Sequence, residues 1–236
     1  NFRQNLRYKI EGSRITNVSS SASNLFKSQE GSRAILEVGQ SLTYNELNSR
    51  LTPTDGYLLK MTNDVAGLGG NVRYLRNKVK AAQYNELFPT WVLSITGSAG
   101  HIIGIDQDVK ITDRFTLGGK SLRGFADGGV GPRDISTDDG LGGEWKYSGS
   151  TQLTFPLGLP NELGISGRLF TDFGSIGEVN PSNAGIRDSG DIRVSAGTGL
   201  GWVSPFGPVN IDFGWTLVEE SYDETERFRF NFGSRF

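Results

Sequence analysis

An arginine set between bulky apolar residues stands out in a long glycine-rich loop of this chain. Ser121-Leu122-Arg123-Gly124-Phe125 is followed by Gly128-Gly129-Val130-Gly131-Pro132-Arg133, and these glycines let the backbone turn sharply. Later in the chain, Phe170-Thr171-Asp172-Phe173-Gly174 carries an acid on a strand-like segment. A guanidinium is a planar fork that matches a carboxylate. The sequence therefore predicts a loop that folds back and pairs Arg123, with Asp172 as the candidate partner.

Residue types that support catalysis are scarce. His101 is the only histidine, cysteine is absent, and a lone histidine at a strand end is usually structural. A surface protease built on ten strands would need acid and histidine groups around a cleft, and no recognisable partner for His101 is present. No phosphate loop or zinc spacing occurs. We therefore predict no enzymatic activity, no cofactor and no resident metal.

A crowd of acids in the same long loop suggests calcium at first sight. The spacing does not match an EF-hand, and a solvated acidic loop is the favoured interpretation. The acids are Asp106, Asp108, Asp113, Asp134, Asp138 and Asp139.

Charge and composition exclude several classes of protein. The chain has 236 residues, and its 24 basic and 26 acidic residues nearly balance, which argues against a nucleic-acid partner. No run approaches the roughly 20 apolar residues of a membrane helix. The absence of cysteine fits the periplasm or the cell surface. Asn1 opens directly in strand-like sequence, so we expect either that a signal peptide was removed or that the chain begins within a longer protein.

Apolar and polar residues alternate with a period of two, most clearly in the second half of the chain. Val209, Ile211, Phe213 and Trp215, for example, alternate with polar residues and glycine. Each such segment is a strand with one apolar and one polar face, about long enough to cross a bilayer when tilted. Ten strands are predicted, near residues 2–17, 32–49, 57–67, 70–86, 91–104, 144–156, 163–174, 191–204, 208–218 and 226–236.

The connections between these strands alternate in length. Short turns rich in proline and glycine, such as Pro53-Thr54-Asp55-Gly56, alternate with long polar loops, and Gly67-Leu68-Gly69-Gly70 is a short connection in a long-loop position. Outer-membrane barrels show this pattern, with the short turns on the periplasmic side. A soluble sandwich or lipocalin-like barrel is the alternative. Aromatic residues near strand ends favour the membrane barrel: Trp91, Trp145, Tyr147, Trp202 and Trp215.

Three features of the chain together resemble the outer-membrane assembly barrel family, which comprises BamA, TamA and the mitochondrial sorting and assembly barrel. They are Leu122-Arg123-Gly124-Phe125, the Phe-x-Asp-x-Gly segment and the terminal Phe236. Ser204-Pro205-Phe206-Gly207-Pro208 resembles a hairpin of the same family. The resemblance implies an all-β, antiparallel transmembrane β-barrel, with residues 1–236 as one partial barrel domain in the outer membrane of a Gram-negative bacterium. It also implies a loop that enters the lumen, where Arg123, Gly124 and Phe125 meet Asp172 and Gly174.

The resemblance further implies that the protein inserts and folds other outer-membrane proteins. Its expected partners are unfolded barrel clients, outer-membrane lipid and accessory lipoproteins that bind through POTRA domains. The aromatic strip of the last strand resembles the signal read by the assembly machinery: Phe228, Phe230, Phe232 and Phe236. A passive porin or a two-partner-type secretion pore is the alternative function.

The chain departs from the family in three respects. Leu122 stands where valine is commoner, and Gln152 occupies an inward position where many relatives have glutamate, so a second carboxylate for Arg123 is expected to be missing. Gln152 itself becomes a possible second contact of the loop. About ten strands are present where the family has about sixteen. The chain therefore resembles the C-terminal portion of a longer protein, without its upstream strands and POTRA domains.

Overall fold

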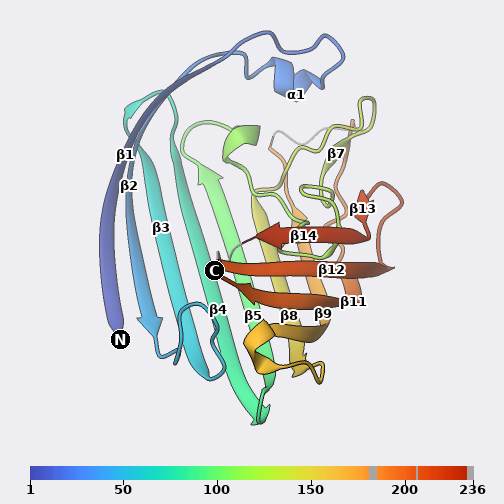
Figure 1. The fold of residues 1–236 in the computed structure, drawn as a ribbon. Helices are drawn as coiled ribbons and strands as arrows, with labels where there is room; N and C mark the ends of the chain where they lie inside the picture. The colour runs from blue at the N-terminus through green and yellow to red at the C-terminus, as the bar shows by residue number, and fades with distance from the viewer. Residues whose placement is uncertain (181–184, 206, 233–236) are drawn as a thin grey trace.

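A computed structural model describes residues 1–180, 185–205 and 207–232. It contains one antiparallel sheet in which ten long strands pair in chain order (Figure 1). These strands are β1 (Phe2–Ile15), β2 (Gly31–Asn45), β3 (Gly56–Gly70), β4 (Tyr74–Phe88), β5 (Trp91–Gly104), β8 (Trp145–Pro156), β9 (Ile165–Gly177), β11 (Arg193–Ser204), β12 (Gly207–Val218) and β14 (Phe228–Phe232).

Short elements lie in the connections between the long strands. The long loops hold two small antiparallel pairs, β6 with β13 and β7 with β10, and the helix α1 (Asn24–Lys27). Their bounds are β6 (Gly124–Phe125), β7 (Arg133–Asp134), β10 (Ile186–Arg187) and β13 (Thr225–Glu226), and the 3-10 turns are η1 (Ile111–Asp113) and η2 (Asn161–Leu163).

The side-chain alternation gives the sheet an apolar outer face and a polar inner face. Outward residues such as Leu169, Trp202 and Phe213 are exposed, whereas Arg168 and Asp172 on the opposite face of β9 are buried. This arrangement confirms the all-β antiparallel transmembrane barrel fold. The sheet curls around a central space, but among the described residues its end strands β1 and β14 do not pair, so it is not closed. No helix within the described ranges is long and apolar enough to span a membrane.

The glycine cluster at 67–70 is part of a strand and does not form the turn that the sequence suggested. β3 continues to Gly70, and the chain reverses over residues 71–73 before β4. Gly67 and Gly70 have φ values of +128° and +85°, and the pairing of β2 with β3 shifts register nearby, between Ile35 and Glu37. Glycine is used here for an irregularity in the strand, a role that sequence alone does not separate from a turn.

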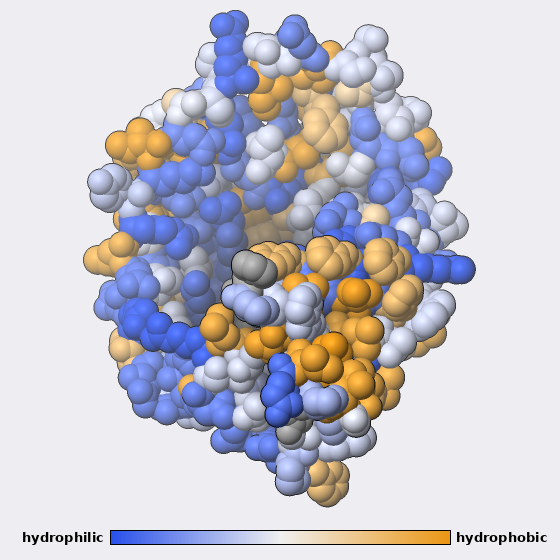
Figure 2. Space-filling model, viewed as in Figure 1, coloured by the Kyte–Doolittle hydropathy of each residue, from blue (hydrophilic) through white to orange (hydrophobic). Residues whose placement is uncertain are grey.

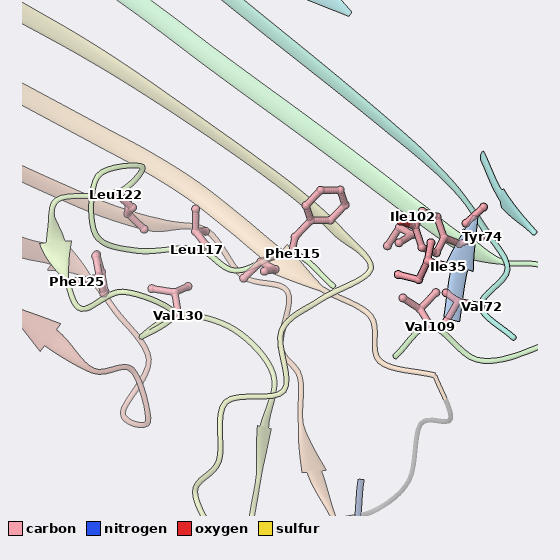
Figure 3. Packing of buried hydrophobic residues seen from close by; sticks show 12 residues of the cluster. Ile35, Val72, Tyr74, Ile102, Val109, Phe115, Leu117, Leu122, Phe125 and Val130 are labelled. Atoms are coloured by element: carbon pink, nitrogen blue, oxygen red, sulfur yellow. The ribbon is translucent and has the colours of Figure 1, made fainter. Parts of the chain in front are cut away.

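Many of the buried apolar residues inside the curled sheet lie on the long loop between β5 and β8. In Figure 3, Leu117, Leu122 and Phe125 lie on this loop, and a second group around Ile102 and Tyr74 lies beside the strands. Leu122 and Phe125 are fully buried. The loop therefore supplies a large part of the interior packing.

Candidate functional site

Arg123 and Asp172 form a bidentate ion pair in the interior. Nε of Arg123 donates to Oδ2 of Asp172 and Nη2 donates to Oδ1, each at 2.7 Å. The backbone N–H of Arg123 donates to Oδ2 as well, at 3.0 Å. The side chains of Arg123 and Asp172 are 1% and 0% exposed. Three charge-assisted hydrogen bonds in a shielded place thus join the loop tip to β9.

The remaining guanidinium donors of Arg123 are used by strand β8. Nη1 donates to Oε1 of Gln152 at 2.8 Å, and Nη2 donates to Oγ of Ser150 at 3.1 Å. The guanidinium carbon also lies 3.3 Å from the ring centroid of Phe170, a stacking contact that favours a cation. Gln152 thus contacts the loop, and every guanidinium nitrogen of Arg123 has a partner.

The expectation that Arg123 lacks a second carboxylate is wrong. Asp212 on β12 places Oδ1 3.5 Å from Nη1 of Arg123, and the same oxygen accepts a hydrogen bond of 2.9 Å from Arg168. Asp212 is buried at 3% exposure. Arg168, Asp212, Arg123 and Asp172 therefore form a chain of alternating charges between β9, β12 and the loop, with balanced charge. Sequence reasoning missed Asp212 and Arg168 as partners, although their alternation already placed both on the polar face.

Backbone conformation explains Gly124 of the site, and close approach of neighbouring atoms explains Gly214 and Gly174. Gly124 has φ +93°, a conformation that other residues rarely adopt. A Cβ added to Gly214 would lie 2.7 Å from N and 3.0 Å from Cα of Gly124, so the loop backbone rests directly on β12. A Cβ on Gly174 would lie 2.8 Å from the carbonyl oxygen of Tyr147 and 3.3 Å from Cδ2 of Leu117, another loop residue. The missing side chains make room for the loop.

We expect Gly214→Ala to loosen the Arg123 loop, because the atoms it would meet are backbone and cannot rotate away. Overpacking of this kind costs about 1–3 kcal/mol in free energy of unfolding. Limited proteolysis of residues 116–131 measures the effect. Gly97→Ala is the matched control, since the nearest atom to its added Cβ is 3.8 Å away. Equal protease resistance of the two variants would contradict the close approach.

The glycines of β11 make room for side chains of the site. A Cβ on Gly197 would lie 2.4 Å from the Phe170 ring, and one on Gly199 would lie 2.5 Å from Oδ1 of Asp212. Three alternate glycines of this strand, Gly197, Gly199 and Gly201, lie on its polar face, a pattern that predicts space for the loop itself. They instead admit the groups on which Arg123 rests.

Long loops pair with one another around the Arg123 segment. β6, which contains Gly124 and Phe125, pairs with β13, and Arg133 donates to Glu224 at 2.8 Å. The loop holding β13 is fixed by a second buried ion pair, in which Nε of Arg193 donates to Oδ2 of Asp223 at 2.8 Å. Those two side chains are 1% and 0% exposed. Sequence reasoning missed this pair because Asp223 lies in a polar loop that shows no periodicity.

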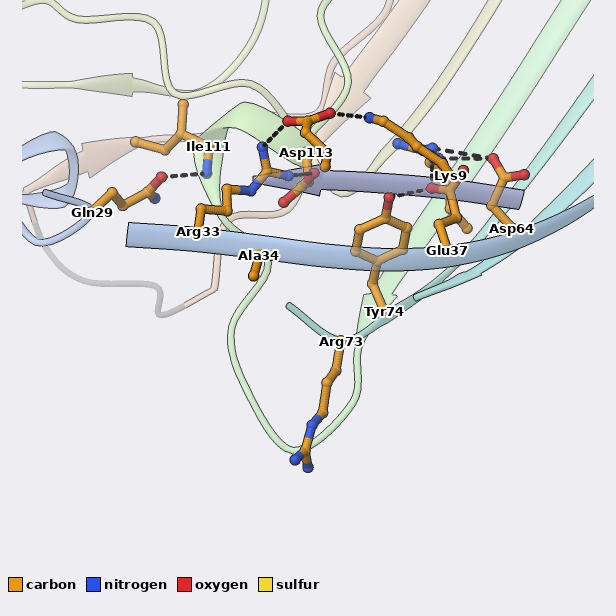
Figure 4. Close-up of polar contacts among 12 residues, drawn as sticks. Lys9, Gln29, Arg33, Ala34, Glu37, Asp64, Arg73, Tyr74, Ile111 and Asp113 are labelled. Carbon is orange, nitrogen blue, oxygen red and sulfur yellow. Dashed lines mark hydrogen bonds and ion pairs between the residues drawn. The ribbon is translucent and has the colours of Figure 1, made fainter. Parts of the chain in front are cut away.

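The loop between β5 and β8 is also tied to the N-terminal part of the chain. Arg33 of β2 forms an ion pair with Asp113, and the backbone N–H of Ser23, beside α1, donates to Asp139 at 2.7 Å (Figure 4 shows the Arg33 contact). Burial raises the pKa of the Asp113 carboxyl, and the Arg33 guanidinium opposes that rise. The interpretation of this loop as a solvated acidic segment is therefore wrong for Asp113, which is buried.

A group of paired charges lies on the inner wall formed by β1 to β4. Arg76 bridges Glu37 and Asp64 at 3.0 and 3.1 Å, and Arg7 pairs with Asp64. The Tyr74 hydroxyl donates to Glu37, as Figure 4 shows. These charges balance one another.

The other predicted residues lie apart from the Arg123 site. Phe228, Phe230 and Phe232 project from the outer face of β14 at 52–59% exposure, and Phe236 lies outside the described residues. His101 is exposed on β5. No group of three or more His, Cys, Asp or Glu in the described part of the chain is placed to hold a metal ion.

The whole of this chain, residues 1–236, matches the Omp85 superfamily domain. The chain belongs to the Omp85 superfamily. Outer membrane protein assembly factor BamA of Neorickettsia risticii is 35% identical over 237 residues, which cover 100% of this chain and 32% of that protein. BamA of Neisseria meningitidis is 27% identical over 81% of this chain and 28% of its own length. The human sorting and assembly machinery component 50 homolog is 31% identical over 65% of this chain and 33% of its own length.

A solved Omp85 structure has the same fold. The crystal structure of BamA from Haemophilus ducreyi lacking POTRA domains 1–3 matches with a TM-score of 0.76 at 24% identity, covering 84% of this chain and 42% of that chain. This Omp85 chain thus spans about a third of the length of the curated relatives that it matches. Its localisation is integral in the outer membrane of a Gram-negative bacterium.

Proposed function

We propose that this chain is the C-terminal barrel portion of a factor that inserts and folds β-barrel proteins in the outer membrane. The observation that carries the proposal is the match over the full chain to BamA of N. risticii. In this proposal the clients are unfolded outer-membrane proteins, and the accessory lipoproteins bind through POTRA domains elsewhere in the longer protein. No catalytic group or cofactor takes part.

Arg123 acts in this proposal as a lock that holds the loop inside the barrel. Its support is the network described above: three hydrogen bonds to Asp172, one each to Gln152 and Ser150, and the nearby carboxylate of Asp212. A loop fixed in this way keeps the inner surface of β8, β9 and β12 in one conformation. The last strands can then pair weakly with their neighbours while the interior keeps its packing.

The last strand provides the working edge in this proposal. Among the described residues, β14 pairs only with β12, over Phe228 to Phe232, and lies at the end of the sheet. A strand at the end of a sheet exposes unpaired backbone donors and acceptors that can template an incoming strand. Its aromatic outer face contacts lipid beside that edge, and the strip serves as the C-terminal assembly signal.

The test is client folding by the full-length protein in proteoliposomes. We expect the wild-type protein to accelerate folding of an added outer-membrane barrel, measured by its heat-modifiable mobility on gels, and Arg123→Ala to remove most of the acceleration. Arg227→Ala, at an exposed position, is the control and should retain the activity.

If the protein is instead a passive porin, the expected results for conductance and client folding are reversed. Conductance across a planar bilayer would then change in Arg123→Ala, while the wild-type protein would fold no client faster than empty liposomes do. That result would contradict the assembly proposal.

A further inference from the structure

A row of cations formed by Arg3, Lys60 and Lys80 lines a cavity on the inner face of the N-terminal strands. The cavity has a volume of about 920 Å³, and its lining includes Arg3, Arg50, Lys60, Lys80 and Lys120. No aspartate or glutamate lines it. This is unexpected in a chain with a formal net charge of −2, and it differs from the ion-paired arginines of the interior, such as Arg76 and Arg123.

The strand register aligns three of these cations. Lys60 of β3 lies directly opposite Lys80 of β4, and Arg3 of β1 lies opposite Thr43 of β2, which in turn lies opposite Lys60. Neighbouring strands are about 4.8 Å apart, so the row spans roughly 14 Å. Among the described residues, Arg3, Lys60 and Lys80 form no ion pair with a carboxylate. Like charges placed directly opposite one another destabilise a sheet.

The comparison with the adjacent positions makes the row distinctive. Four residues away on the same strands and the same face lie Arg7 of β1, Asp64 of β3 and Arg76 of β4. Both of these arginines form an ion pair with Asp64. The fold thus neutralises its cations on one part of this wall and leaves them unmatched on the next. Figure 2 shows hydrophilic residues gathered over the N-terminal strands beside the hollow.

We propose that this cavity binds an acidic polypeptide segment. Carboxylates of the segment would neutralise the row formed by Arg3, Lys60 and Lys80. Hydroxyl groups beside the row, including Ser98 and Ser148, which hydrogen-bond to each other at 2.9 Å, offer partners for its backbone.

Two observations favour a peptide over other anions. Leu47, Leu58 and Ala82 line the same cavity next to the cations, which suits a chain that carries both apolar and acidic side chains and gives no benefit to an inorganic phosphate. The cavity also opens on the inner, polar face of the sheet, whereas the apolar residues that would contact lipid lie on the opposite face. A lipid headgroup would therefore have to leave the bilayer to reach the row.

The proposal is tested by binding alone, so its outcome is independent of client folding. The full-length protein in detergent is titrated into a fluorescein-labelled peptide of four Glu-Ser-Leu repeats, and fluorescence anisotropy is recorded. We expect saturable binding that weakens with added salt, no binding of the same peptide with Gln in place of Glu, and about tenfold weaker binding by the Lys60→Gln/Lys80→Gln double variant. Lys27→Gln/Lys110→Gln, in the loops at the other end of the strands, should bind like the wild type.

A second variant keeps the test informative if the glutamine variant misfolds. If the double glutamine variant loses its compact band on unheated gels, Lys60→Arg/Lys80→Arg takes its place and should keep binding within about twofold. The proposal is overturned if the acidic peptide does not bind, if the glutamine variant folds and binds it as tightly as the wild type, or if inorganic pyrophosphate binds while the peptide does not.

Discussion

Replacing Arg123 with alanine should reduce the free energy of unfolding of the full-length protein by about 3–5 kcal/mol, because it removes the guanidinium that neutralises the buried Asp172 carboxylate. Asp172 is 0% exposed, so water cannot replace the lost donors without opening the interior. Urea unfolding in detergent, followed by tryptophan fluorescence, measures the change. Arg123→Lys should be intermediate, since an ammonium keeps the charge but cannot bridge both oxygens of Asp172 and also reach Gln152.

The control for this prediction is Arg227→Ala, which removes an exposed arginine and should change the free energy of unfolding by no more than about 0.5 kcal/mol. If Arg123→Ala were as stable as this control, the ion pair would have no energetic role and the loop would be held by its apolar residues alone.

Arg193→Ala should have an effect of similar size, about 3–5 kcal/mol, on a different loop. Arg193 donates to both oxygens of Asp223, at 2.8 and 3.2 Å, and to Ser189 and the carbonyl of Asp191. The loop that holds Asp223 also contains β13, the partner of β6. We therefore expect faster proteolysis of residues 219–227 together with the lower stability.

Arg187→Ala is the matched control for Arg193. Both guanidinium carbons lie within 6 Å of the Tyr222 ring, at 5.8 and 5.7 Å, but Arg187 is exposed and the Asp223 carboxylate bonds to Arg193. Replacement of Arg187 should have little effect on the proteolysis of residues 219–227 or on the free energy of unfolding. A loop that is cleaved equally fast in both variants would show that Asp223 does not anchor it.

The sequence predicted the strands well because membrane exposure imposes a strict period. From β5 to β12 the predicted limits agree closely with the structure; 91–104, for instance, coincides with β5. The predicted last strand, 226–236, ends outside the described residues. The small pairs β6–β13 and β7–β10 were not predicted, since two-residue strands carry no periodic signal. The turn between β3 and β4 was misplaced because glycine serves both turns and strand irregularities.

The candidate site shows where sequence reasoning ends. Asp172 could be proposed because the Phe-x-Asp-x-Gly segment resembles a family motif. Asp212 could not, because its contact with Arg123 depends on how β12 follows the curvature of the sheet and on the absence of a side chain at Gly214. Polar-face alternation identifies inward acids, but it does not identify which arginine each one meets.

The most direct test of the central claim, that the Arg123–Asp172 pair supports client assembly, is a double-mutant cycle on the client folding rate in proteoliposomes. Arg123→Ala, Asp172→Ala and the double variant are compared with the wild-type protein. We predict that each single variant loses most of the acceleration and that the double variant is no slower than the slower single variant, because the two groups act as one unit. Single variants that fold client at the wild-type rate would contradict the account, as would losses that multiply in the double variant.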